Sequence, residues 1–263
     1  MIEWNFQPEI VTLGPIVLRW YSMLFMFAFL FGFFIMQRIY KIEGYKPERV
    51  DQLFLVVFLS TIIGARLGHC LFYDPAYFLS NPLEIFMVWK GGLASHGAAI
   101  GILTGLYIYS KKNPDLSYAW IVDRVVIVVA LAAFFIRLGN LFNSEIIGIP
   151  TNSDWGFIFT RIDSIPRHPT QLYEAIAYLG IFFVLIYIYN KKRQQLKNWF
   201  LTGLFFVLLF GFRFFIEFYK ENQSGFEESM VLNMGQLLSI PITLAGLLLM
   251  VKSVYKTNHN KKE

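Results

Sequence analysis

The most distinctive polar stretch of the sequence is RLGNLFNSEIIG, residues 137–148, which directly follows the apolar run of residues 125–136. It carries a guanidinium group on Arg137, amides on Asn140 and Asn143, and a carboxylate on Glu145. A guanidinium group presents a planar fork of N–H donors that matches phosphate and carboxylate oxygens. Amides and a carboxylate beside it could orient that fork or hydrogen-bond a ligand. The stretch therefore indicates a site for an anion.

Other ionisable side chains stand in or beside apolar segments. GARLGH places Arg66 between two glycines, which allow close helix approach. GGLASHGAAIG surrounds His96 with small residues; we expect them to leave space for a ligand beside the ring, and a packed, hydrogen-bonded histidine is the alternative. His168 lies in RHPTQLYEA. GFRFFIEF places Arg213 and Glu217 on one helix face, where Glu217 alternatively forms a structural ion pair.

The composition of the chain is that of a membrane protein. Of its 263 residues 56% are hydrophobic and 16% charged, against roughly 25% charged in a soluble domain. The net charge is +5, but no basic run exceeds three residues, so we attribute the excess to membrane topology and not to nucleic-acid binding. Cys70 is the only cysteine, which excludes an intrachain disulfide and fits a packed apolar residue. We expect no metal and no cofactor.

Seven apolar segments are long enough to cross a bilayer, which takes about 20 residues as a helix. They are residues 17–36, 53–72, 93–110, 120–139, 171–189, 199–217 and 235–251. This predicts an all-α bundle of seven transmembrane helices that forms a single integral-membrane domain over residues 1–263. Residues 140–170 predict a small periplasmic head within it, of unpredicted fold.

The connections between these segments differ in Lys and Arg content, which predicts their orientation. The basic connections and the tail carry Arg38, Lys41, Lys46, Arg49, Lys111, Lys112, Arg124, Lys191, Lys192, Arg193, Lys197, Lys252, Lys256, Lys261 and Lys262. The other side carries only Lys90, Arg161, Arg167 and Lys220. Because the positive side is cytoplasmic, we predict the N-terminus outside and the C-terminus inside. Most of the polar motifs then gather at the outer ends of the helices.

The polar motifs lie at one depth in the membrane, which favours a ligand pocket over a transport pathway. A proton or ion pathway would distribute charged groups through the membrane, and a transporter often shows an internal repeat, which we do not find. We predict a pocket for an anionic amphiphile that enters from the outer leaflet, and an anionic phospholipid is the simplest such ligand. A membrane lipid transporter and a membrane phospholipase with water as the nucleophile are the alternatives.

Five motifs match one family in order and spacing. The first resembles R-x-G-N-x-x-N-x-E-x-x-G and is matched by Arg137, Gly139, Asn140, Asn143, Glu145 and Gly148. The others are GARLGHCLFY, GGLASHG, RHPTQLYE and RFFIEF, and the similarity runs from GPIVLRWYSMLF to MGQLLSIPI. On these motifs the chain resembles the bacterial prolipoprotein diacylglyceryl transferases.

The resemblance implies a reaction at the outer face of the bacterial cytoplasmic (inner) membrane. In that family the diacylglyceryl group of phosphatidylglycerol is transferred to the lipobox cysteine thiol of a preprolipoprotein. The products are a thioether-linked lipid and glycerol phosphate, in the first step of lipoprotein maturation. The implied partners are phosphatidylglycerol, the preprolipoprotein signal peptide and membrane lipids, with no nucleic acid. This is alkyl transfer, so we expect no oxyanion hole for a tetrahedral intermediate.

The chemistry of such a transfer suggests roles for the candidate residues. A thiol must become a thiolate to attack, and an imidazole can accept its proton at neutral pH, so we expect His96 to be the base. The phosphate gains negative charge as it leaves, so Arg137 and Arg213 are expected to stabilise it. The expected substrate-binding residues are Tyr21, which resembles a family tyrosine, and Arg66, Asn140, Asn143, Glu145, Gly148, His168 and Glu217.

Overall fold

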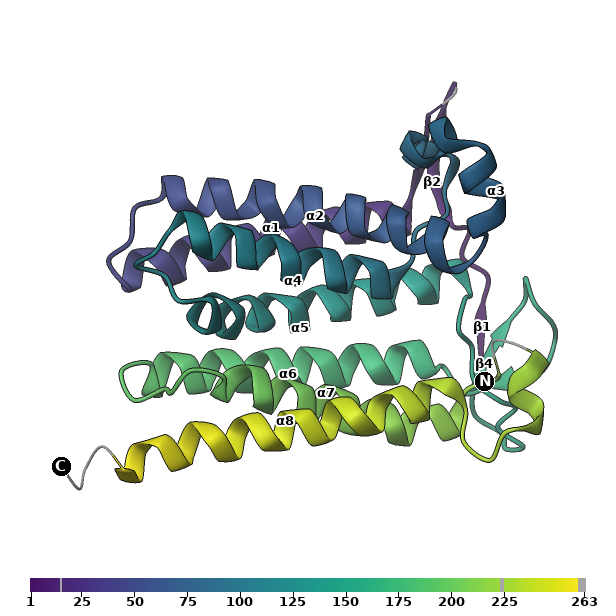
Figure 1. Cartoon of the computed structure of the whole chain (residues 1–263). Coiled ribbons are helices and arrows are strands. Elements are labelled where there is room, and N and C mark those ends of the chain that lie inside the picture. Colours follow the sequence, from purple (N-terminus) through teal and green to yellow (C-terminus); the bar gives the residue numbers. More distant parts are fainter. Residues whose placement is uncertain (15, 223–224, 260–263) are drawn as a thin grey trace. The chain divides into compact units, whose positions relative to one another are not determined.

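The computed structural model describes residues 1–14, 16–222 and 225–259, and helices dominate it (Figure 1). The long helices are α1 (Trp20–Ile42), α2 (Glu48–Phe72), α4 (Ser95–Lys112), α5 (Tyr118–Asn143), α6 (Thr170–Lys192), α7 (Phe200–Ile216) and α8 (Met234–His259). Shorter elements are α3 (Pro75–Ser80), η1 (Pro82–Phe86), η2 (Val88–Lys90), η3 (Glu217–Tyr219) and η4 (Gly225–Ser229). The basic residues Lys261 and Lys262 of the tail lie outside the described residues, as does the side chain of Lys256.

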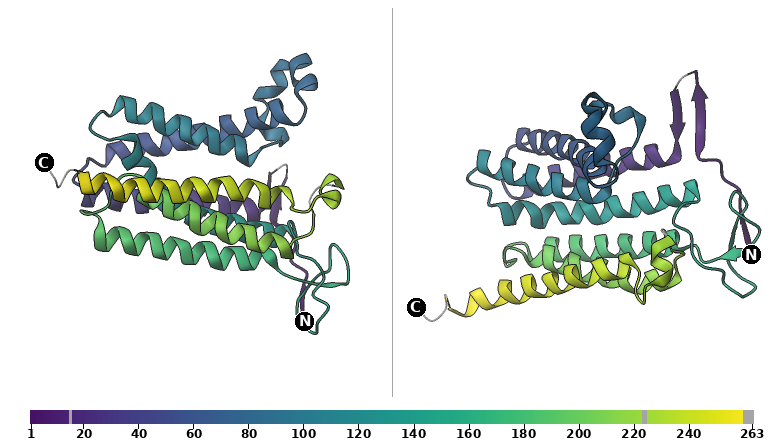
Figure 2. Two further views of the ribbon diagram at one scale, coloured as in Figure 1. Left: turned by 60° about the horizontal axis from the view of Figure 1, so that its bottom comes forward. Right: turned by 45° about the vertical axis from the view of Figure 1, so that its right-hand side comes forward.

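The chain divides into two compact units, whose boundaries fall inside α1 and α5. One unit holds residues 1–35 and 123–263, and the other holds residues 36–122. In the first unit α6, α7 and α8 run side by side in every view (Figures 1 and 2). Helices α7 and α8 approach closely because a Cβ atom on Gly203 would lie 2.7 Å from the carbonyl oxygen of Gly246.

A buried carboxylate fixes the start of α7 to α5. Asp123 is 1% exposed. Its side-chain oxygens accept hydrogen bonds from the backbone N–H groups of Trp199 at 2.7 Å and Thr202 at 2.8 Å. These N–H groups belong to the first turn of a helix and have no partner within it. Asp123 therefore caps α7 from a neighbouring helix.

The first unit also contains a small three-stranded sheet in the order β1-β4-β5. The strands are β1 (Ile2–Trp4), β4 (Phe157–Phe159) and β5 (Pro166–Arg167); β1 pairs parallel to β4, and β4 antiparallel to β5. Phe157, Phe159 and Leu141 form the hydrophobic core beneath it. The Nε1 of Trp4 donates to the carbonyl oxygen of Leu141 at 3.0 Å, which ties the N-terminus to this sheet. We call residues 144–169 with β1 the head.

The structure corrects the predicted fold class in detail and two of the predicted span boundaries. The expectation of an all-α fold was wrong in detail, because the head sheet and a hairpin of β2 (Glu9–Leu13) and β3 (Ile16–Arg19) accompany the helices. The first span does not begin at residue 17, since residues 16–19 pair with β2 and α1 begins at Trp20. The fourth span does not end at residue 139, since α5 continues to Asn143.

In the second unit α2 and α4 pack glycine against glycine. A Cβ atom on Gly64 would lie 2.4 Å from the carbonyl oxygen of Gly97, and one on Gly68 would lie 2.6 Å from its Cα. A Cβ atom on Gly101 would lie 2.3 Å from the carbonyl oxygen of Ser60. This confirms that the glycines of GARLGH permit close helix approach.

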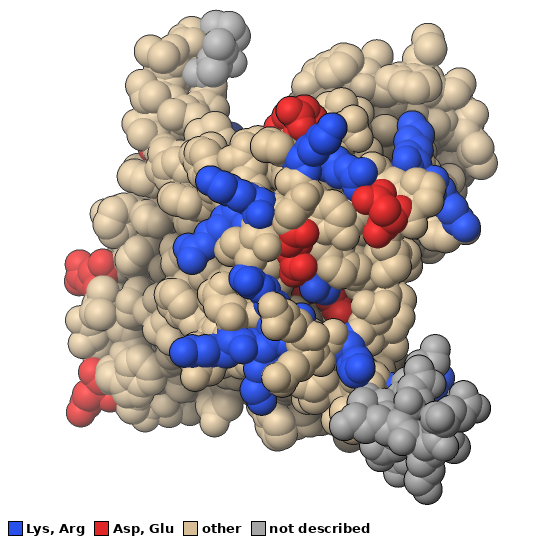
Figure 3. Space-filling model, turned by 90° about the vertical axis from the view of Figure 1, so that its left-hand side faces the viewer, with Lys and Arg blue, Asp and Glu red and all other residues tan. Residues whose placement is uncertain are grey.

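Within the residues that the structure describes, six helices are long and apolar enough to cross a membrane, namely α1, α2, α5, α6, α7 with η3, and α8. The chain is therefore a predominantly helical, multi-pass membrane protein. Helix α4 is not among the six, and its glycines, His96 and two terminal lysines dilute its apolar character. Figure 3 turns the left-hand side of Figure 1 toward the viewer and shows Lys and Arg gathered on that face.

Candidate functional site

Five charged side chains of the first unit form one continuous network. Arg137 Nε lies 3.0 Å from Glu174 Oε2, and Lys220 Nζ lies 3.0 Å from Glu174 Oε1. The same Lys220 Nζ lies 2.9 Å from Glu217 Oε1, which is 3.3 Å from Arg213 Nε. The order is thus arginine, glutamate, lysine, glutamate, arginine. Residues from α5, α6, α7 and η3 meet in it.

The network is buried and carries one excess positive charge. Side-chain exposure is 0% for Glu174, 1% for Lys220, 7% for Glu217 and 12% for Arg137, whereas Arg213 is 35% exposed. Buried charges are costly unless opposite charges and hydrogen bonds compensate them. Three cations face two carboxylates, so the five groups together would gain from a singly charged anion.

Neighbouring residues fix the two carboxylates. Tyr178, one turn after Glu174 in α6, donates its hydroxyl hydrogen to Glu174 Oε1 at 2.8 Å. Asn233, just before α8, donates from Nδ2 to Glu217 Oε2 at 3.3 Å. A Cβ atom on Gly235 would lie 2.4 Å from the Glu217 carboxyl carbon, so this position admits the carboxylate only as glycine.

Residues 137–148, which match the family motif and are called the signature stretch below, bend back so that their polar side chains meet. Asn140 accepts from Arg137 Nη1 at 3.2 Å and donates to Glu145 Oε2 at 3.2 Å. Asn143 donates to Glu145 Oε1 at 3.1 Å, and Gln171 Nε2 donates to the backbone carbonyl of Glu145 at 2.6 Å. Asn140 and Arg137 lie in the last two turns of α5, so this part of the signature is helical and does not follow the helix.

The turn after α5 stores backbone strain. Ser144 and Ile146 both have φ of 56°, a conformation that is costly for a β-branched residue. The hydrogen bonds to Glu145 from either side hold this turn in place. Within α5, a Cβ atom on Gly139 would lie 2.6 Å from the ring of Tyr21. Tyr21 therefore packs directly against the signature helix.

Two further predicted residues belong to the packing of the head. A Cβ atom on Gly148 would lie 2.4 Å from the carbonyl oxygen of His168, so this position requires glycine. His168 Nδ1 lies 3.3 Å from the Tyr173 hydroxyl, and its ring contacts Trp155 and Tyr219. Burial lowers the pKa of His168, which favours its neutral form.

Arg167 secures the same region. It donates from Nε and Nη2 to Asp163 Oδ2 at 2.9 and 2.6 Å, and from Nη1 to the carbonyl of Gly148 at 3.2 Å. It also pairs with Glu221. The hydrogen bonds from Arg167 lower the pKa of Asp163. The structure therefore places Gly148 and His168 beside the charged network and outside its chain of contacts.

Arg66, in the second unit, is 4% exposed and binds backbone carbonyl groups. Its Nε donates to Ile85 at 3.0 Å, its Nη2 to Glu84 at 2.5 Å, and its Nη1 to Gly91 at 2.6 Å. In this arrangement the guanidinium group fastens the segment between α2 and α4 to α2. A role for Arg66 in binding phosphate stays a prediction.

His96 is an exposed side chain in the first turn of α4. Its ring contacts Phe72 at 5.2 Å and Tyr73 at 5.9 Å between ring centroids. The expectation that neighbouring glycines leave space for a ligand is wrong for Gly97 and Gly101, because the backbone of α2 occupies that space.

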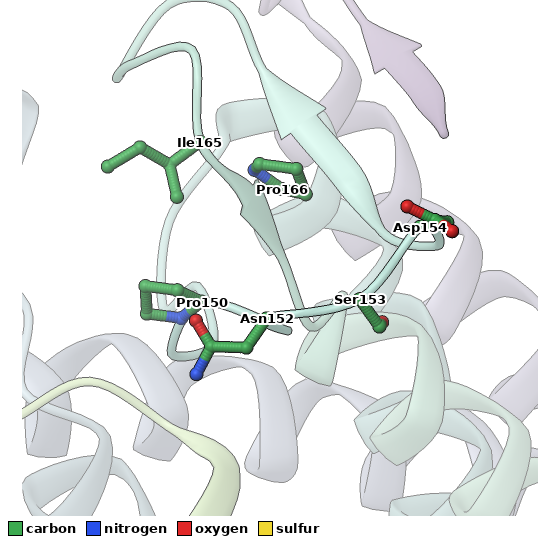
Figure 4. A pocket seen from close by; sticks show the side chains of 6 residues that line it. All are labelled: Pro150, Asn152, Ser153, Asp154, Ile165 and Pro166. Carbon is green, nitrogen blue, oxygen red and sulfur yellow. The ribbon is translucent and has the colours of Figure 1, made fainter.

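A cavity of about 260 Å³ lies in the head and is separate from the charged network. Figure 4 shows its lining by Pro150, Asn152, Ser153, Asp154, Ile165 and Pro166. It holds one carboxylate and no cation, so it does not suit an anion. Across the part of the chain that the structure describes, no three or more His, Cys, Asp or Glu side chains are grouped to hold a metal ion.

The sequence of the chain is similar to one family over nearly all its length. The model of the family "Prolipoprotein diacylglyceryl transferase" matches residues 8–252. The chain belongs to this family. This confirms the resemblance seen in the motifs.

Relatives named phosphatidylglycerol–prolipoprotein diacylglyceryl transferase agree with this assignment. That of Tolumonas auensis is 45% identical over 96% of this chain and 98% of its own length. That of Chloroherpeton thalassium is 45% identical over 99% and 97%, and that of Bacteroides fragilis is 42% identical over 95% and 94%. The similarity to these transferases is therefore not confined to one part of the chain.

Two residues at the centre of the network, Glu174 and Lys220, stand in or beside the polar motifs of the sequence but were not among the predicted site residues. Glu174 stands one turn before Tyr178 in an otherwise apolar helix, and Lys220 stands three residues after Glu217. An acidic residue in an apolar helix needs a partner, and this signal could have marked Glu174. The spacing of Lys220 from Glu217 could have marked the lysine.

Proposed function

We propose that this chain transfers the diacylglyceryl group of phosphatidylglycerol to the lipobox cysteine thiol of preprolipoproteins. The observation that carries this proposal is the family match over residues 8–252, together with relatives of that name across the whole chain. The excess positive charge of the buried network supports it, because the phosphodiester of phosphatidylglycerol carries one negative charge.

In the proposed reaction the thiolate sulfur attacks a glycerol carbon of the lipid. The new carbon–sulfur bond forms as the carbon–oxygen bond to phosphate breaks, and the electron pair of that bond goes to the phosphate oxygen. His96 takes the thiol proton. The leaving glycerol phosphate approaches two negative charges, so cations bind it more strongly than they bind the diester.

Arg213 and Arg137 are proposed to stabilise that developing charge. Among the described residues, the contacts of Arg213 involve its Nε, so its terminal nitrogens can bind phosphate. Arg137 contacts Glu174 through Nε and Asn140 through Nη1, and it also hydrogen-bonds Tyr178; these contacts orient the guanidinium group that is proposed to meet the phosphate. Tyr21, Asn140, Asn143 and Glu145 are proposed to bind the headgroup or to keep Arg137 oriented. Arg66, Gly148, His168 and Glu217 are proposed to support binding from further away.

We further propose the membrane arrangement of the chain. Helix α4 also crosses the membrane, as the third span in chain order, and brings the number of spans to seven. The N-terminus then lies outside and the C-terminus is cytoplasmic, in agreement with the distribution of Lys and Arg. The reaction then takes place on the periplasmic side of the bacterial inner membrane. The two compact units share the continuous helices α1 and α5, and we expect them to work as one membrane domain with the head attached.

An assay with purified protein, labelled phosphatidylglycerol and a lipobox peptide tests the function. The expected result is a mass increase of one diacylglyceryl group on the peptide cysteine and release of glycerol phosphate. A peptide with Ser in place of that Cys is the control and should gain no mass. Lipid cleavage without peptide and without a mass increase would instead indicate a phospholipase, and lipid movement without cleavage a transporter.

A further inference from the structure

Lys220 occupies the centre of the charged network. Its ammonium group lies within 3.0 Å of Glu174 and 2.9 Å of Glu217, and its side chain is 1% exposed. An ammonium group has three donors and no acceptor. Two of the three donors of Lys220 form hydrogen bonds to the two carboxylates. At this burial Lys220 is removed from solvent and from a lipid headgroup that Arg213 could reach.

The two carboxylates that Lys220 binds are the ones that hold the two arginines. Glu174 binds Arg137 Nε at 3.0 Å, and Glu217 binds Arg213 Nε at 3.3 Å. Lys220 therefore stands between the two guanidinium groups and contacts each only through a glutamate. A displacement of the ammonium group would move both carboxylates and, with them, both arginines.

The backbone around Lys220 is fixed to the end of the signature stretch. Lys220 forms a β-bridge with Gly148. Ile149 N donates to Tyr219 O at 3.0 Å, and Glu221 N donates to Ile147 O at 3.2 Å. The main chain thus sets the position of the ammonium group relative to α5, and does not leave it to a flexible side chain alone.

We propose that Lys220 is a positioning residue for the transferase reaction, holding Glu174 and Glu217 so that Arg137 and Arg213 keep a fixed spacing around one phosphate. It also supplies the charge that leaves the network with a net charge of +1. Without it, two arginines and two glutamates would cancel and attract no anion. The inference rests on the proposed function. It predicts that loss of Lys220 raises KM for phosphatidylglycerol and leaves KM for the lipobox peptide nearly unchanged.

The test replaces Lys220 by Met, which keeps the apolar length of the side chain and removes its charge. Relative to wild type, Lys220→Met should raise KM for phosphatidylglycerol about tenfold or more, since the loss of a buried ion-pair partner commonly exceeds 1.4 kcal/mol. KM for the lipobox peptide should stay within about twofold, since the lysine acts on the phosphate side only. Lys220→Arg, which keeps the charge, should hold the lipid KM within about threefold of wild type.

The matched control is Lys90→Met, which removes a lysine from an exposed ion pair with Glu84. It should change neither KM. Thermal unfolding in detergent is recorded for each variant. An unchanged lipid KM in Lys220→Met would overturn the proposal, and so would an equal rise in both KM values together with a lower Tm, because that result indicates a purely structural residue.

A further measurement keeps this test separate from the proposed function. The Tm increase caused by phosphatidylglycerol, without peptide, reports lipid binding independently of turnover. If wild type transfers nothing but Lys220→Met loses this increase, the function fails and the positioning role stands. If Lys220→Met is too unstable to purify, Lys220→Arg decides, and a lipid KM raised about tenfold or more would overturn the proposal.

Discussion

Arg137 shows how much a single residue is constrained in this site. Its Nε is bound by Glu174 and its Nη1 by Asn140, with only 12% of the side chain exposed. These two contacts use different nitrogen atoms of one rigid, planar guanidinium group. A lysine has one nitrogen on a flexible stem and cannot reproduce them together with a contact to phosphate.

We therefore predict that Arg137→Lys lowers kcat/KM about 10²–10³-fold, the usual cost of removing an electrostatic contact to a transition state. The measurement is peptide modification under saturating and limiting lipid. Arg38→Lys, the same change at an exposed position in α1, is the control and should retain full activity. Turnover of Arg137→Lys close to that of wild type would remove Arg137 from the proposed mechanism.

His96 is exposed at the start of α4, where a thiol could approach its ring. If it takes the thiol proton, His96→Gln should abolish transfer at neutral pH. Above pH 8.5 the free thiol is largely ionised without help, so the variant should regain activity as the pH rises, while wild type should change little. A His96→Gln enzyme as active as wild type at pH 7 would show that another group, or the solvent, takes the proton.

At the scale of residues, the sequence predicted part of the site and missed its centre. It selected Arg137, Asn140, Glu145, Arg213 and Glu217, which the structure does bring into contact. It did not select Glu174 and Lys220 as residues of the charged network, because their role depends on the side chains that they contact in the folded protein. The contact between Lys220 and Glu174 joins positions 46 residues apart, and no local spacing reveals it; only the contact of Lys220 with Glu217, three residues before it, follows from local spacing.

At the scale of elements, the six most apolar helices were predictable because each needs a long apolar segment. Their ends were less so. Residues 16–19 are apolar enough to continue α1, but pairing with β2 places them in a hairpin. The head sheet was not predictable either, since its strands have two or three residues and alternate too briefly to give a pattern.

The contact between α2 and α4 gives a prediction about glycine. In an exposed helix position Gly→Ala usually stabilises by up to about 1 kcal/mol. At Gly101 a Cβ atom would lie 2.3 Å from the carbonyl oxygen of Ser60, which belongs to the backbone and cannot rotate away. Gly101→Ala should therefore destabilise the protein, by about 1–3 kcal/mol as for other overpacked positions.

Thermal unfolding in detergent measures this effect, with Gly180→Ala as its matched control. Gly180 lies in α6 with nothing within 4 Å of its Cβ position, so this variant should keep or raise the Tm. A lower Tm for Gly101→Ala alone agrees with the glycine contact. Equal Tm changes in the two variants would mean that α2 and α4 can separate without cost.

At the scale of the whole molecule, the remaining question is how many times the chain crosses the membrane. In the described part of the chain six helices qualify by length and apolar composition, and α4 does not. Glycines lower its hydropathy, yet they are also what lets α4 pack against α2. A helix that buries its backbone against a neighbour needs fewer apolar side chains of its own. Whether or not α4 crosses decides on which side of the membrane every later loop lies, so the number of spans can be measured by labelling the loops.

We predict seven spans with the N-terminus outside. The background is Cys70→Ala, which removes the single cysteine of the sequence, a buried one. Single cysteines are then placed at four exposed positions, Ser80, Lys112, Ser153 and Gln194. A membrane-impermeant maleimide should label the Ser80 and Ser153 variants in intact cells, and the Lys112 and Gln194 variants only after permeabilisation. Ser80 and Lys112 flank α4, so their labelling from the same side would show that α4 does not cross the membrane. Labelling of the Lys112 and Gln194 variants in intact cells, with the Ser80 and Ser153 variants protected, would instead show that the orientation is reversed.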